Sequence, residues 1–374
     1  MDNVYFGLGS FHFYRTTEPE DEEENYRTYV DEIERILNAC SNINNIVIEN
    51  NHTFKRIVAM NLLYRNELEI DEDKMSYNKL NGIYPNPCNL IIEFDLFIPL
   101  RVQEDIHRKI NPPKTYTENF KVYIIYDNYF PVVIVELINP KDDCKPSDGV
   151  YVVKKFLQNE LEKKSEFLSF MSMGPSPFHG EFIITYTSYE SEDFQVRLVK
   201  ENRRGYHSYF FELNNTLDLE EYKSSIYLSI ARELGYYYEL EQISNRRNFN
   251  WIRIEVLVDM LLESYSLKFW NIKRYYKIRV LLNELFQSIS RFERDEIFFR
   301  QQYNNAMKEI YANGESTFFK KDIDMQYENF MDFPVEQVLK YINTFEQRRL
   351  NLNEASSAII GGVVGALLTI LFAK

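Results

Sequence analysis

Few residues of this chain have the types and spacing that enzymatic or metal sites need. None of its five histidines forms a close metal-binding pair with another. The run His179-Gly180-Glu181 contains the histidine and glutamate of zinc deaminases, but no Pro-Cys-x-x-Cys follows it. No GxxxxGK[ST] phosphate loop and no GxSxG serine motif occurs. We therefore expect no catalytic residue, no metal centre and no enzymatic activity, and the sequence does not identify whether a cofactor is bound.

Three carboxylates leave one enzymatic alternative open. Glu93 and Asp95 belong to one predicted strand, and Glu136 belongs to another. An acidic pair on one strand with a glutamate on a second is typical of metal-dependent nucleases. The lysine that such a site needs after Glu136 is missing, because Leu137-Ile138 follows. A membrane-tethered nuclease is therefore a lesser alternative.

Two short segments are the candidates for binding a small ligand. The loop over residues 171–180 is rich in glycine, proline and serine, and it offers Ser176 and His179. The turn that contains Arg203 and Arg204 adds guanidinium groups and aromatic neighbours, which can hold phosphate and stack on a base. An ordinary helix-to-strand connection and a solvated turn are the alternatives for the two segments.

The elements that must position these residues form an α+β domain with a mixed sheet, rich in antiparallel pairs. Apolar and aromatic runs predict strands over residues 5–14, 46–48, 90–98, 181–186, 194–199 and 208–212. The runs 120–126 and 131–137 flank a short turn and predict a hairpin. Helical periodicity predicts helices over residues 21–38 and 152–170.

From about Leu217 onward the periodicity becomes helical. Between Ile278 and Ile310, apolar residues recur at alternating steps of four and three, which is a heptad seam interrupted by Glu296. Two antiparallel helices within one subunit and a stalk between subunits both fit this seam. A last helix is expected to begin near Pro334, because proline suits the first helical turn.

The C-terminal segment is different from the rest of the chain. Residues 355–373 carry no charged side chain and are apolar on all sides. As a helix they span roughly 28 Å, close to the ~30 Å hydrocarbon core of a bilayer. Arg348 and Arg349 precede this span and only Lys374 follows it, so the positive-inside rule places the larger N-terminal part in the cytoplasm. A buried helix of a soluble protein is the alternative.

Small residues line this predicted transmembrane helix at every fourth position. One stripe contains Ser357, Gly361, Gly365 and Thr369, and Gly362 belongs to a neighbouring stripe. Small residues at this spacing let helix backbones approach closely in lipid. Two parallel stripes favour a homo-oligomeric bundle, in which each helix has two neighbours.

Composition limits the classes of partner. The formal net charge is −14, and a chain this acidic lacks the basic footprint that DNA binding needs. No basic stretch followed by an apolar run opens the sequence, so we expect no secretory signal peptide. Three widely separated cysteines indicate reduced thiols in a cytosolic setting. The expected partners are membrane lipid, further copies of the chain and a small nucleotide ligand.

The order of these parts resembles the layout of CorA-type magnesium channels. A cytosolic α/β domain comes first, long helices follow, and a membrane helix comes last. CorA proteins have two membrane helices with a Gly-Met-Asn loop between them, whereas this chain has one candidate span and no such motif. No functional residue is therefore carried over. The layout is also similar to effectors of prokaryotic antiviral systems, which implies a nucleotide-sensing domain coupled to a membrane-disrupting part.

Together the sequence predicts three parts. A cytosolic sensor or ligand-binding domain covers residues 1–215, a helical stalk or bundle covers 216–353, and a single transmembrane helix covers 354–374. The expected function is that of a membrane-anchored, homo-oligomeric sensor and effector, in which ligand binding opens a pore or disrupts the membrane. The alternative from another class is a tail-anchored scaffold that recruits a cytosolic partner.

Overall fold

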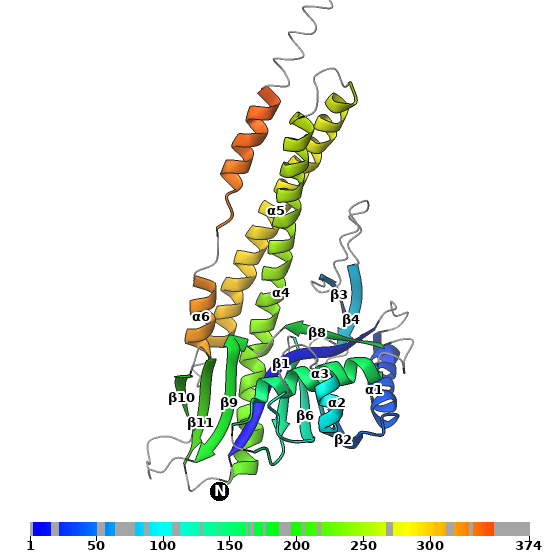
Figure 1. The fold of residues 1–374 in the computed structure, drawn as a ribbon, viewed down its shortest axis with the longest axis vertical. Coiled ribbons are helices and arrows are strands. Elements are labelled where there is room, and N and C mark those ends of the chain that lie inside the picture. The colour runs from blue at the N-terminus through cyan, green and yellow to red at the C-terminus, as the bar shows by residue number, and fades with distance from the viewer. Residues whose placement is uncertain are drawn as a thin grey trace, which may run out of the picture. The chain divides into compact units, whose positions relative to one another are not determined.

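A computed structural model shows how the chain folds (Figure 1). It describes residues 3–15, 22–50, 57–63, 79–85, 90–106, 113–127, 130–141, 143–161, 164, 168–174, 177–186, 196–203, 206–214, 218–266, 272–311, 318–328 and 332–347.

All described strands lie within the first 213 positions, together with shorter helices, and long helices follow them. The strands are β1 (Val4–Arg15), β2 (Ile43–Asn50), β3 (Ile57–Leu63), β4 (Lys79–Pro85), β5 (Leu90–Phe97), β6 (Asn119–Tyr126), β7 (Val132–Leu137), β8 (Leu168–Gly174), β9 (Gly180–Tyr186), β10 (Val196–Arg203) and β11 (Tyr206–Leu213). The helices are α1 (Glu22–Asn38), α2 (Leu100–Ile106), α3 (Pro146–Leu161), the short 3-10 helix η1 (Pro177–His179), α4 (Leu219–Ser266), α5 (Ile272–Tyr311), α6 (Lys320–Glu328) and an unlabelled helix over residues 335–347.

The strands form one mixed sheet, as the sequence predicts. Its main path runs in the order β10-β11-β9-β1-β7-β6-β5-β2, and β3, β4 and β8 attach beside it. Described neighbours on this path pair antiparallel except β9 and β11, which pair in parallel. The predicted hairpin is confirmed as β6 and β7. β1 is long enough to pair with β7 and β9 through its first half and with β8 and β4 through its second.

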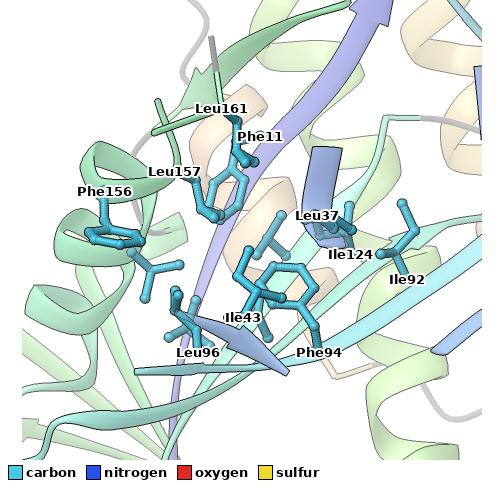
Figure 2. Close-up of a cluster of buried hydrophobic side chains, with 14 of the residues drawn as sticks. Phe11, Leu37, Ile43, Ile92, Phe94, Leu96, Ile124, Phe156, Leu157 and Leu161 are labelled. Atoms are coloured by element: carbon cyan, nitrogen blue, oxygen red, sulfur yellow. The ribbon is translucent and has the colours of Figure 1, made fainter. Parts of the chain in front are cut away.

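Helices α1, α2 and α3 cover one face of this sheet. Alternate residues of a strand point to opposite faces, and the buried positions of β5 follow that alternation. They meet apolar side chains of α1 and α3 in one core, and α2 packs at its margin. Figure 2 shows part of this core: Phe11, Leu37, Ile43, Ile92, Phe94, Leu96, Ile124, Phe156, Leu157 and Leu161.

The first turns of α4 pack on the opposite face of the sheet. The ring of Tyr227 lies 5.3 Å from that of Phe6 and 5.1 Å from that of Tyr123, measured between centroids. The Tyr227 hydroxyl lies 3.3 Å from Glu136 Oε2, and Lys223 Nζ lies 3.6 Å from the same oxygen. The sheet is therefore covered on both faces.

One predicted element is wrong. The expected helix over residues 152–170 is instead α3, which ends at Leu161, and strand β8, which begins at Leu168. The polar run that starts at Glu162 ends the apolar stripe of the helix. The residues after it pair with the second half of β1, so a partner distant in sequence decides their conformation.

The chain divides into two compact units. The first contains Met1–Arg246 and Gln301–Glu328, and the second contains Arg247–Arg300 and the chain from Asn329 onward. Both helical boundaries fall inside elements, one within α4 and one within α5.

The heptad seam packs within the chain. In the second unit, Ile278, Leu282, Leu285, Ile289 and Phe292 are buried against α4 and the helix over 335–347. Along the contact between α4 and α5, residue numbers increase on one helix as they decrease on the other. Trp251 contacts Phe292, and further along α4 Tyr265 contacts Arg274. The two helix segments are therefore antiparallel, and this stretch of the seam has intramolecular partners.

The polar interruption of the seam has a partner on α4. The Arg247 guanidinium donates two hydrogen bonds to the Glu296 carboxylate, through Nε to Oε2 and through Nη2 to Oε1, the latter at 3.0 Å. Arg300 donates to Glu296 as well, at 3.2 Å. The guanidinium carbon of Arg247 also lies 4.5 Å from the centroid of Phe333. This pair therefore joins α4 to α5 and also contacts the segment that precedes the helix over residues 335–347.

Among the residues that the structure describes, no helix is long and apolar enough to cross a membrane. The predicted transmembrane helix over residues 354–374 lies outside the described residues.

The close approach of α3 to β1 gives a first prediction. A Cβ atom on Gly7 would lie 2.4 Å from the backbone oxygen of Pro146, whereas one on Gly9 would meet only a Val150 methyl group, at 2.8 Å. Gly7→Ala should therefore push α3 off the sheet and reduce the free energy of unfolding by about 1–3 kcal/mol. Gly9→Ala is the matched control with a smaller loss. Urea denaturation measures both, and equal losses would contradict the explanation.

The buried ion pair gives a second prediction. Arg247→Leu leaves the Glu296 carboxylate without its main partner, and we expect it to lower the free energy of unfolding of the second unit by about 3 kcal/mol. The double variant Arg247→Leu/Glu296→Leu removes both charges and should recover most of that loss. Thermal unfolding followed by tryptophan fluorescence tests this. Additive losses in the double variant would show that the two side chains are not coupled.

Candidate functional site

The two predicted ligand segments meet at one end of the sheet. β9 begins at Gly180, directly after the first segment, and β11 begins at Tyr206, directly after the second. These strands are parallel neighbours, with His207 opposite Gly180, so the segments that precede them lie at the same edge. The backbones of His179 and Arg203 belong to η1 and β10. Ser176 and Arg204 lie outside the described residues, and ligand binding by all four stays a prediction.

An aromatic cluster fixes this end of the sheet. Phe178 adopts a positive φ of 56°, and its ring centroid lies 5.0 Å from that of Tyr237 and 5.6 Å from that of Phe319. Gly180 allows the close approach of Tyr209, because a Cβ atom there would lie 2.7 Å from the tyrosine ring. Packing between aromatic rings therefore fixes the backbone conformation around Phe178, in the segment that the sequence predicts to be a loop.

Helix α6 is attached to this cluster by a buried carboxylate. Glu233 is 4% exposed, and its two oxygens accept hydrogen bonds from the backbone N–H groups of Phe318, at 2.6 Å, and Phe319, at 2.8 Å. The Glu233 carboxylate thus satisfies backbone N–H donors that lie just before the first turn of α6, where a negative charge is favourable. Asp322, in that turn, forms an ion pair with Lys200 of β10. Burial raises the pKa of Glu233 to about 7 despite both hydrogen bonds.

A groove that gathers charged groups lies on the α3 side of the sheet, at the start of that helix. Its volume is about 790 Å³, which is within the ~300–1,000 Å³ of small-molecule sites. Strands β1, β9 and β11 supply one wall, and the segments before and at the start of α3 supply the other. The lining residues are Asn3, Tyr5, Lys114, Asp143, Cys144, Lys145, Pro146, Glu181, Ile183, Ser208 and Phe210.

Glu181 is a titratable group in the lining of this groove. It lies on β9 beside Ser208 of β11, and the hydroxyl of Ser147 on α3 donates a hydrogen bond to its Oε1, at 3.1 Å. Burial raises the pKa of Glu181 to about 7, while the hydrogen bond from Ser147 and the charge of Lys145 oppose that rise. The carboxyl therefore changes its charge near neutral pH.

Backbone hydrogen bonds hold the two lysine segments of the groove together. The N–H of Lys145 donates to the carbonyl of Lys114 at 2.7 Å, and the N–H of Lys114 donates to the Asp148 carboxylate at 3.0 Å. The two residues come from distant loops but are neighbours in space. Both residues line the groove, and the charge of Lys145 acts on Glu181.

The acidic residues of the nuclease alternative have other partners. All three face α4, on the opposite side of the sheet from the groove. Glu93 Oε1 pairs with Lys121 Nζ at 2.7 Å, and Asp95 accepts a hydrogen bond from Asn45 at 2.6 Å. Glu136 contacts α4 as described above. Within the described ranges, no group of three or more histidine, cysteine or acidic side chains could hold a metal ion.

Sequence reasoning missed the groove because its residues form no motif. Lys114, Lys145 and Glu181 are distant along the chain, and each is an ordinary charged residue in its local context. The one available signal was the position of Glu181 in an otherwise apolar strand start. Glu181 becomes part of a groove only because α3 packs against β1, and the sequence does not specify that packing.

Comparison with protein-family models, curated proteins and solved structures finds no match to this chain.

The attachment of α6 gives a third prediction. Because the pKa of Glu233 rises from a usual value near 4.5 to about 7 in the folded protein, its contribution to stability is complete below pH 4.5 and is lost as the pH rises through 7. Glu233→Gln cannot ionise, so its free energy of unfolding should fall less than that of the wild type between pH 5.5 and 8. Chemical denaturation at both pH values measures this. Glu201→Gln, at an exposed position, is the control, and a variant at Glu233 with unchanged pH dependence would contradict the assignment.

Proposed function

We propose that this chain is a membrane-anchored, homo-oligomeric sensor and effector. In this proposal the α+β unit binds a small ligand, and the C-terminal helices convert binding into a change in the membrane. The single observation that carries the sensing part is the groove at the start of α3. It combines a suitable volume, two lysines and a carboxyl group with a pKa of about 7.

The lining of this groove favours binding over catalysis. The Ser147 hydroxyl donates a hydrogen bond to Glu181, but among the described residues no third group forms a hydrogen bond that orients this pair. The apolar residues Tyr5, Ile183 and Phe210 line it as well. Apolar walls with a few polar groups are typical of ligand-binding sites.

Helix continuity supports transmission between the units. The first part of α4 packs on the sheet through Tyr227, and the same helix continues into the second unit through Trp251. Helix α4 crosses the boundary between the units without an intervening loop, and in this proposal it carries the change from one unit to the other. The helix over residues 335–347 packs on this part of α4 and precedes the segment for which a transmembrane helix is predicted.

The membrane part is tested by changing the small-residue stripe, which is our fourth prediction. Gly361→Leu and Gly365→Leu should prevent close helix contact in lipid. We expect the detergent-solubilised wild type to be a homo-oligomer by light scattering, and the double variant to shift toward the monomer. Vesicles that contain the wild type should also release an entrapped dye faster than vesicles with the variant.

Leu371→Ile is the matched control, because it changes neither charge nor the stripe. Replacement of residues 355–373 by an unrelated apolar helix separates the two functional classes. An effector should lose dye release, whereas a scaffold should keep its activity because its tail is only an attachment. A wild-type protein that stays monomeric and leaves vesicles intact would exclude the proposal.

A further inference from the structure

The described charged groups around the groove balance each other. Lys114 and Lys145 are positive, and Asp143 is negative. Asp148, in the first turn of α3, adds a second negative charge, because its carboxylate accepts the N–H of Lys114 and its charge acts on Glu181. With Glu181 neutral, the two positive and two negative charges cancel. The groove therefore has no net preference for an anion or a cation, but it offers local partners of both signs.

Glu181 is the acidic partner on the strand wall of the groove. It lies on β9 beside Ser208 of β11, and the Ser147 hydroxyl that donates to it at 3.1 Å is a neutral group. Burial outweighs the charge of Lys145 and raises the pKa of Glu181 to about 7. A cationic group bound beside this carboxyl would replace the hydration that burial removes and would favour the ionised form.

Apolar side chains form the adjoining part of the strand wall. Tyr5 on β1 pairs with Ile183 on β9, and Ile183 pairs with Phe210 on β11, so these three residues form an apolar row across adjacent strands. Ile183 is two residues after Glu181 on the same strand, which puts both on one face roughly 7 Å apart. A ligand that contacts both the carboxyl and the apolar row therefore needs an apolar group close to its positive charge.

These features fit one class of compound. We propose that the groove binds a zwitterionic α-amino acid with a large apolar side chain. Its ammonium group lies beside Glu181, its carboxylate pairs with the ammonium groups of Lys114 and Lys145, and its side chain packs on the apolar row. The inference rests on the proposed sensing function and names the ligand class for it. The groove volume of about 790 Å³ is sufficient for such a compound.

Glu181 gives the binding a pH dependence with a defined sign. The described titratable groups around its carboxyl are Asp148 on α3, Tyr5 on β1, and Lys114, Asp143, Cys144 and Lys145 on the opposite wall. The ligand ammonium needs the ionised carboxyl, so binding should strengthen as the pH rises through about 7. The gain between pH 6 and pH 8 should be roughly tenfold, because a carboxyl with a pKa of about 7 is about nine-tenths protonated at pH 6.

The test is our fifth prediction and uses the full-length protein in detergent with L-phenylalanine as the probe. Isothermal titration calorimetry at pH 8 should show that it binds. Phenethylamine lacks the carboxylate and 3-phenylpropionate lacks the ammonium group, so each should bind at least roughly tenfold more weakly. Glycine lacks the apolar side chain and should also bind at least roughly tenfold more weakly.

Two variants assign the two charged ends of the ligand. Glu181→Gln keeps an acceptor for Ser147 but has no charge, so phenylalanine should lose its advantage over 3-phenylpropionate and bind with little pH dependence. Lys114→Gln/Lys145→Gln should abolish the advantage over phenethylamine. Each variant should keep the other preference, which a misfolded protein would not. Lys141→Gln, at an exposed position shortly before Lys145, is the matched control and should keep both preferences.

Three results would contradict the inference. Phenylalanine that does not bind, or that binds no better than either singly charged analogue, would overturn the ligand class. A double lysine variant that still prefers phenylalanine to phenethylamine would overturn the placement of the carboxylate. Affinity for phenylalanine that falls as the pH rises from 6 to 8 would overturn the role of Glu181.

The failure of this inference can be told apart from the failure of the proposed function. If the groove rejects phenylalanine while the protein remains an oligomer that permeabilises vesicles, the ligand class is wrong and the effector function stands. If phenylalanine binds as expected but vesicles and oligomeric state give negative results, the ligand class stands and the membrane function is wrong.

Discussion

The contact between α3 and β1 is the constraint on which the first unit depends. Gly7 and Gly9 lack side chains on the α3 side of the strand, and the helix occupies that space through Pro146 and Val150. Because β1 pairs with β7 on one side and β9 on the other, the same contact fixes α3 against the middle of the sheet. The start of α3 then lies beside β9, and Ser147 reaches Glu181. The core and the groove are thus consequences of one close packing contact.

The second unit uses a different device for specificity. Its core is a continuous row of apolar contacts between antiparallel helices, and a row of that kind permits the helices to slide by one heptad. Arg247 and Glu296 remove this freedom, since a shifted register would leave both charges without their partners. The heptad interruption that looks like a defect in the sequence therefore sets the alignment of the helices.

Much of the fold was predictable because its signals are local. The hairpin of β6 and β7 and the helices α1 and α5 follow from apolar periodicity alone. The failures have a common physical cause, which is pairing between distant segments. β8 is a strand because β1 offers it an edge, and β3 and β4 pair with each other although neither was expected. Glu181 becomes a candidate binding residue only after α3 and β9 have been brought together. By contrast, the transmembrane helix is predicted from local composition alone, and its residues lie outside those that the structure describes.

The packing of Trp251 has an optical consequence. Both tryptophans of the chain, Trp251 and Trp270, belong to the second unit, while the groove belongs to the first. Trp251 is 6% exposed and packs against Phe292 and Phe333, so its emission reports the packing of the three helical segments. The native protein thus carries its own spectroscopic reporter in the unit that does not hold the groove. A shift in the emission wavelength when a non-quenching compound binds in the groove would measure communication between the units without any attached dye.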